Sequence, residues 1–131
     1  MKLYEKMKID LKDKYLISLV GGGGKTTTML RLAKEFKEAD KRVLVTTSTA
    51  ICNIEESYYF LEKIREDFRP DKASLTIFGE YVENNKIFGK KDNIDEIWER
   101  DIFDIILVEA DGANKKPIKA PRDYEPQIPN H

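Results

Sequence analysis

Short apolar runs alternate with amphipathic segments along this chain. Residues 16–20 are apolar apart from Ser18 and end at four consecutive glycines, a pattern typical of a buried strand followed by a tight connection. Over residues 26–38, apolar side chains recur three or four positions apart with charged side chains opposite them, which predicts an amphipathic helix. Residues 43–47 and 103–108 are also apolar apart from Thr46, Thr47 and Asp104, and we predict that both segments are buried strands.

Three other segments carry helical patterns. Residues 1–9 place two apolar side chains one turn apart, so we predict a short amphipathic helix packed on the outside of the sheet. Apolar side chains also recur at helical spacing before Pro70, which predicts a helix over residues 54–68. A further short helix is predicted to begin near Asp92 or Asn93, because either side chain can cap its first turn.

The remaining segments favour extended structure or loop. Residues 75–78 and 81–88 look extended, and asparagines within 83–86 suit a hairpin turn because Asn tolerates positive φ. The chain beyond Gly112 is rich in Pro and Lys and is predicted to be loop. Alternating strands and helices predict an α/β fold: a P-loop NTPase-type three-layer sandwich whose mainly parallel sheet carries an added β-hairpin at an edge. We expect one domain over residues 1–131.

The glycines after the first strand predict a phosphate site. Glycines let the backbone wrap around a polyphosphate with its N–H groups pointing inward, and the following helix adds free donors and a positive dipole end. Lys25 is expected to contact the β- and γ-phosphates, the Thr26 hydroxyl to bind Mg²⁺, and Thr27 to contact the α-phosphate side. The loop is a shortened form, because Leu19 stands where the usual pattern has its first glycine. The predicted phosphate-binding set is Gly21, Gly22, Gly23, Gly24, Lys25, Thr26 and Thr27.

Acidic and hydroxyl side chains follow two of the predicted strands. Glu109 and Asp111 end the run at 103–108, where P-loop enzymes place an acid that binds Mg²⁺ or orients the attacking water. We therefore assign catalytic roles to Lys25, Glu109 and Asp111, and leave open which acid faces the metal. Thr47 is the preferred nucleotide-contacting hydroxyl at the end of the second strand. The simpler alternatives are an ordinary strand end in solvent and a hydroxyl that caps a helix.

Composition limits the possible function classes. The 23 basic and 24 acidic residues nearly cancel, so no general electrostatic attraction to nucleic acid or an anionic membrane is expected. A single cysteine, Cys52, and a single histidine, His131, make an internal disulfide, a thiolate cluster or a His-based metal site untenable. No apolar run approaches the ~20 residues that span a bilayer, and we expect a cytoplasmic protein.

Five blocks of sequence carry a family resemblance. They are Val-Gly-Gly-Gly-Gly-Lys-Thr-Thr at 20–27, Val-Thr-Thr-Ser-Thr at 45–49, Val-Glu-Ala-Asp-Gly-Ala at 108–113, Pro-Ile-Lys-Ala-Pro at 117–121 and Glu-Pro-Gln-Ile-Pro at 125–129. In this order they resemble the selenium-dependent hydroxylase accessory proteins, which are YqeC-like P-loop proteins. The resemblance implies nucleotide binding and hydrolysis coupled to the maturation of a selenium-dependent molybdenum hydroxylase or its cofactor.

The chain departs from the resembled family in two ways. Tyr124 stands where the family usually has a histidine, so no role of that histidine is carried over. The family also continues beyond the last block, so we expect this chain to be the N-terminal part of a longer protein. A sheet edge left uncovered in that case would favour homo-oligomers.

Three functions are compatible with these patterns. The first is a Mg²⁺-dependent NTPase that uses ATP or GTP and acts as a maturation factor. The second is an ATP-dependent ligase or transferase, because ligases that add amino acids to peptidoglycan precursors share the shortened loop and because Lys115, Lys116 and Lys119 could meet an anionic substrate. The third is a nucleotide-sensing module that binds without turnover.

Overall fold

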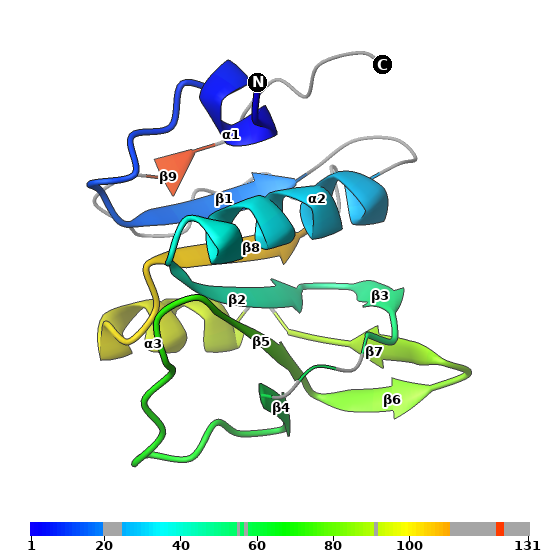
Figure 1. Ribbon diagram of the computed structural model, residues 1–131. Helices are drawn as coiled ribbons and strands as arrows, with labels where there is room; N and C mark the ends of the chain where they lie inside the picture. Colours follow the sequence, from blue (N-terminus) through cyan, green and yellow to red (C-terminus); the bar gives the residue numbers. More distant parts are fainter. Residues whose placement is uncertain (20–24, 55, 57, 91, 111–122, 125–131) are drawn as a thin grey trace.

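The computed structural model describes residues 1–19, 25–54, 56, 58–90, 92–110 and 123–124. Figure 1 shows its helices and strands. In chain order they are α1 (Leu3–Lys6), β1 (Tyr15–Leu19), α2 (Lys25–Glu38), β2 (Arg42–Thr47), β3 (Ala50–Cys52), β4 (Tyr58–Leu61), β5 (Ser74–Gly79), β6 (Tyr81–Glu83), β7 (Lys86–Phe88), α3 (Asp92–Arg100), β8 (Ile105–Glu109) and β9 (Asp123–Tyr124).

Within the described residues, the main sheet contains six strands in the order β4-β5-β2-β8-β1-β9, and each neighbouring pair is parallel. β8 lies between β1 and β2, so its last residue, Glu109, pairs with Leu19 on one side and Thr47 on the other. These three strand ends therefore meet at the carboxyl edge of the sheet. In open α/β sheets this edge is where ligands bind.

Helices cover both faces of the main sheet (Figure 1). On one face, α2 buries Met29, Leu32, Ala33 and Phe36 completely, because these positions share one side of the helix. α1 lies on the same face, where Tyr4 stacks on Phe36 with ring centroids 5.3 Å apart. The opposite face has its own core around α3, with Ile94, Ile97 and Trp98 against strand residues. The α/β fold with a mainly parallel sheet in three layers is thus confirmed.

The hairpin belongs to a second sheet. β6 and β7 are antiparallel, and their turn has positive φ at Asn84 (51°) and Asn85 (59°), as the sequence predicts. However, β7 pairs with β3 to give a three-stranded sheet in the order β3-β7-β6. The hairpin therefore does not extend an edge of the main sheet, and β3 is an element that sequence analysis missed.

The helix predicted over residues 54–68 is wrong. Residues 58–61 form β4, which pairs with β5 at the edge of the main sheet. Glu62 then takes a left-handed backbone conformation with φ of 70°, which would interrupt any helix. Ile64 and Phe68 belong to an irregular segment, and both side chains are buried in the α3 core. Their helical spacing in the sequence therefore does not indicate a helix, because each side chain packs separately into that core.

Two smaller predictions also need correction. The helix predicted over residues 1–9 is limited to α1, because Lys8 has a φ of 59°. The chain beyond Gly112, predicted to be loop, contributes the short strand β9 beside β1. No helix in the described part of the chain is long and apolar enough to cross a bilayer.

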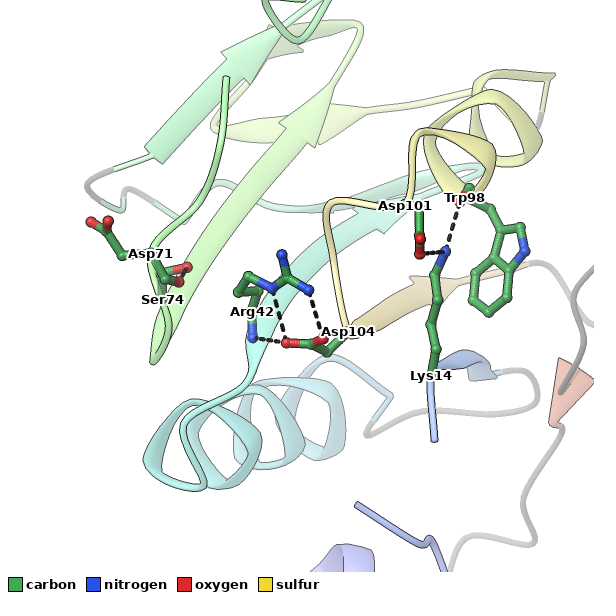
Figure 2. Close-up of polar contacts among 7 residues, drawn as sticks. All are labelled: Lys14, Arg42, Asp71, Ser74, Trp98, Asp101 and Asp104. Atoms are coloured by element: carbon green, nitrogen blue, oxygen red, sulfur yellow. Dashed lines mark hydrogen bonds and ion pairs between the residues drawn. The ribbon is translucent and has the colours of Figure 1, made fainter. Parts of the chain in front are cut away.

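Two ion pairs lie at the other edge of the sheet, where the strands begin (Figure 2). Asp104 accepts hydrogen bonds from the main-chain N–H, Nε and Nη2 of Arg42 at 2.9, 3.1 and 2.9 Å. Burial is the largest single effect and opposes ionisation of Asp104, but the hydrogen bonds and charge of Arg42, with the charge of Lys41, together lower the pKa of this carboxyl below its ordinary value. Lys14 contacts Asp101 at 2.9 Å and lies 3.9 Å from the centre of the Trp98 ring. These contacts fix the strand starts.

Candidate functional site

The start of α2 and the end of β8 meet through their side chains. The Thr26 hydroxyl, in the first turn of α2, donates a hydrogen bond to Glu109 Oε2 at 3.0 Å. These two residues are 83 positions apart in the sequence. The Glu109 residue is buried, with 8% of its surface exposed. A carboxylate and a hydroxyl therefore share one site beside the helix that follows the glycines.

The main chain of Glu109 is held from both sides. The N–H of Ala110 donates to the carbonyl of Leu19 at 3.1 Å, which ties β8 to the last residue of β1. On the other side, the Glu109 carbonyl accepts from the Thr47 hydroxyl and from the Ser48 N–H, each at 3.0 Å. The peptide that follows Glu109 is thus fixed between β1 and β2.

Thr47, the last residue of β2, is buried at the carboxyl edge of the main sheet. It has no exposed surface, and its hydroxyl accepts a hydrogen bond from the Thr49 N–H at 3.0 Å while it donates to Glu109. The sequence predicts a nucleotide contact for Thr47, whereas in the structure its hydroxyl points at the main chain of β8 and of its own turn. Its neighbour Thr46 points elsewhere and donates to the carbonyl of Phe78 in β5 at 2.8 Å.

Gly89 brings the second sheet against this turn. A Cβ atom at position 89 would lie 2.0 Å from the carbonyl oxygen of Thr47, so only glycine fits the close approach of the two backbones. The N–H of Gly89 also donates to the carbonyl of Thr49 at 3.1 Å. Sequence analysis missed this contact, and the only available signal was a glycine directly after the predicted hairpin.

The other predicted site residues fall into two groups. Lys25 is the first residue of α2, as the predicted connection from glycines to helix requires, and Thr27 is exposed on the first turn. Gly21, Gly22, Gly23, Gly24 and Asp111 lie outside the described residues. The structure therefore brings together Thr26, Glu109 and Thr47 from the predicted set.

Comparisons with known proteins give the family. A profile of the family described as "YqeC protein" matches residues 17–131, which is most of the chain. The chain belongs to the YqeC family. It is 36% identical over 121 residues to the Escherichia coli (strain K12) protein described as "Uncharacterized protein YqeC", with 87% of this chain and 47% of that protein aligned. The expected family membership is thus confirmed.

A second relative of this YqeC-family chain carries an enzyme name. The chain is 29% identical over 114 residues to a protein named guanylate kinase from Chlamydia caviae, with 82% of this chain and 53% of that protein aligned. The chain therefore spans about half the length of the curated relatives it matches. No solved structure matches it.

The chemistry of the Thr26–Glu109 pair fits Mg²⁺. This ion prefers hard oxygen ligands in an octahedron at about 2.0–2.1 Å, and it usually keeps waters and phosphate oxygens beside one or two protein ligands. The Thr26 hydroxyl and the Glu109 carboxylate both offer such oxygen atoms, and their 3.0 Å separation would allow one ion to contact both. The described residues contain no cluster of three or more His, Cys, Asp or Glu side chains able to hold a metal, so the fit depends on phosphate and water as further ligands.

Proposed function

We propose that this YqeC-family chain binds a nucleoside triphosphate, ATP or GTP, together with Mg²⁺ and hydrolyses it. The observation that carries this proposal is the hydrogen bond between Thr26, at the start of α2, and Glu109, at the end of β8. It joins the helix that follows the glycine-rich sequence to a strand-end acid. Both lie at the carboxyl edge of a parallel sheet, the usual ligand edge in this fold class.

Each residue then has a defined task. The N–H groups of residues 21–26 donate to phosphate oxygens, and Lys25 places a positive charge against the β- and γ-phosphates. Thr26 and Glu109 would hold Mg²⁺, which would supply positive charge beside the phosphates. Asp111 is the second acid of the proposed site and either supports the metal or orients the attacking water. Thr27 contacts the α-phosphate side.

Phosphoryl transfer to a second substrate is the other candidate reaction. One of the relatives is named a kinase, and the structure has a cavity of about 510 Å³ on the α3 side, bordered by Phe78, Asn93, Ile97 and Arg100. A volume of this size falls in the range of small-molecule sites.

The cellular role we propose is maturation of a selenium-dependent molybdenum hydroxylase, in the cytoplasm. It is supported by the resemblance of the five sequence blocks to the accessory proteins of such hydroxylases. Deletion of the gene in a host that has such a hydroxylase should lower the activity and selenium content of that enzyme. Unchanged content and activity would remove this part of the proposal.

Calorimetric titration tests nucleotide binding directly. The unaltered chain should bind ATP or GTP with Mg²⁺, and Lys25→Ala should lose most of this affinity because the β- and γ-phosphates lose the positive side chain that contacts them. Lys34→Ala is the matched control, since Lys34 is an exposed lysine of the same helix. Equal affinities of the unaltered chain and Lys25→Ala would contradict the assignment, as would failure of both nucleotides to bind.

The fate of a labelled γ-phosphate separates the reactions. Release of inorganic phosphate without a second substrate supports hydrolysis. Label that leaves the nucleotide only when a small acceptor is added supports transfer. Tight binding without turnover in either condition would make the chain a nucleotide-sensing module and refute the hydrolysis step, while the binding proposal would stand.

A further inference from the structure

We propose that Thr47 is a positioning residue, which sets the orientation of the Glu109 carboxylate through the main chain and does not itself contact the nucleotide. The inference rests on the proposed function, because it concerns the same metal-binding acid. It assigns a distinct task to the turn at residues 47–49 and to the second sheet that packs on it.

The peptide that joins Glu109 to Ala110 is held by hydrogen bonds at both its N–H and its carbonyl. Its N–H donates to β1 through Leu19, and its carbonyl accepts from β2 through the Thr47 hydroxyl and the Ser48 N–H. A peptide plane held at both ends cannot rotate without breaking a hydrogen bond. The direction of that plane sets the backbone dihedral ψ of Glu109 and hence limits where its side chain points.

The second argument is the environment of the Thr47 hydroxyl. It is completely buried and is engaged both as a donor to Glu109 and as an acceptor from the Thr49 N–H. A hydroxyl enclosed in this way has no surface to offer a ligand. Its donor hydrogen is directed at the one residue whose carboxylate contacts Thr26.

The third argument is the rigidity of the turn that carries Thr47. Gly89 packs its backbone against the Thr47 carbonyl and donates to the carbonyl of Thr49. The second sheet thereby prevents the turn from moving away from β8. Because the turn is held in place, the Thr47 hydroxyl can hold the Glu109 carbonyl in one position. A hydroxyl on a mobile turn would move together with the carbonyl and would not restrict it.

The test compares isosteric variants of two adjacent threonines. Thr47→Val removes the donor to the Glu109 carbonyl and also the acceptor for the Thr49 N–H, while it keeps the shape of the side chain. Thr46→Val is the matched control, because Thr46 is also buried and loses one hydrogen bond of similar length, to Phe78 in β5. Thr47→Ser keeps the hydroxyl and should behave like the unaltered chain.

The measured quantity is the nucleotide dissociation constant in EDTA divided by the nucleotide dissociation constant in Mg²⁺. A larger ratio means that the metal contributes more to nucleotide binding. Loss of a group that orients a metal ligand typically costs about 10- to 100-fold in metal affinity. We expect Thr47→Val to lower the ratio by about 10-fold or more, and Thr46→Val and Thr47→Ser to leave it unchanged. Melting temperatures, measured in parallel, should fall in both valine variants, and further in Thr47→Val, because that variant loses two hydrogen bonds and Thr46→Val loses one.

An unchanged ratio in Thr47→Val, or an equal fall in Thr46→Val, would overturn the inference. Should Thr47→Val fail to fold, Thr47→Ala, which also removes the hydroxyl, is compared with Thr47→Ser: a ratio that falls in the alanine variant and is retained in the serine variant supports the inference, and equal ratios in the two overturn it. If the unaltered chain binds nucleotide equally with and without Mg²⁺, the proposed metal site itself fails. This result concerns the unaltered chain alone, so failure of the proposed metal site can be told apart from failure of the role proposed for Thr47, which only the variants test.

Discussion

Asp104→Asn should destabilise the fold from the edge opposite the proposed site. The carboxylate accepts three hydrogen bonds from Arg42, two of them from the guanidinium. Hydrogen bonds to charged groups contribute roughly 1.5–3 kcal/mol each, but the two side chains are 30% and 35% exposed, so solvent screens the pair. Asparagine also keeps one acceptor oxygen. We therefore expect a loss of about 2 kcal/mol in the free energy of unfolding at pH 7.

The same contact predicts a pH dependence. The pKa of Asp104 is lowered in the folded state, because the effect of burial, although the largest single one, is smaller than the combined effect of the Arg42 hydrogen bonds and the charges of Arg42 and Lys41. A carboxyl of this kind contributes stability above its unfolded pKa of about 3.9 and loses it as the pH falls through the folded value. The difference between the unaltered chain and Asp104→Asn should thus persist at neutral pH and shrink below about pH 4.

Urea unfolding at several pH values measures both effects. Asp101→Asn is the matched control, because Asp101 forms the other ion pair at this edge but its side chain is 80% exposed; an exposed pair contributes about 0–1 kcal/mol. Equal losses in the two variants, or a difference for Asp104→Asn that does not shrink in acid, would refute the reasoning. Nucleotide affinity should not change, since Glu109 lies five strand residues away, about 16 Å.

Three further substitutions test packing and backbone conformation by urea unfolding. Gly89→Ala should destabilise the chain by about 3 kcal/mol, since its Cβ would meet the Thr47 carbonyl oxygen at 2.0 Å; a loss below about 1 kcal/mol would contradict this close approach. Thr76→Val should stabilise it by about 1 kcal/mol, because the Thr76 hydroxyl is buried with no hydrogen-bond partner in the described structure; destabilisation would indicate a partner. Asn85→Val should cost about 1 kcal/mol because of its positive φ of 59°, whereas Asn85→Gly should be tolerated, and equal effects would argue against the turn.

The helix α2 and the strands β1, β2, β5 and β8 could be predicted from sequence because their apolar patterns are local and strong. Their residues are buried as continuous runs or along one helix side, which is what parallel strands and amphipathic helices require. The hairpin turn was equally local, since two adjacent asparagines supply the positive φ that it needs.

Pairing between segments that are distant in the sequence explains the wrong helix over residues 54–68 and the missed strand β3. Residues 58–61 form a strand because β5 offers an open edge beside them, and no local pattern reveals that edge. The same holds for β3, whose partner β7 lies more than 30 residues further along the chain. Helical spacing of Ile64 and Phe68 with earlier residues was coincidental, because each fills its own place in the α3 core.

The candidate site was partly predictable for a similar reason. The glycines and Lys25-Thr26 form a contiguous motif, and a strand-end acid is expected at the same sheet edge. The meeting of Thr26 and Glu109 agrees with that expectation. The burial of Thr47 was not predictable, because the direction of its hydroxyl depends on the register between β2 and β8 and on the approach of Gly89.

The central claim is that phosphates and Mg²⁺ are held between the start of α2 and the end of β8. Crystals grown with a non-hydrolysable triphosphate and Mn²⁺, which replaces Mg²⁺ and is located by its anomalous scattering, test it most directly. We predict the metal peak about 2.0–2.2 Å from Thr26 Oγ1, with the Glu109 carboxylate bound to it directly or through one water. A bound nucleotide whose metal contacts neither Thr26 nor Glu109 would contradict the account.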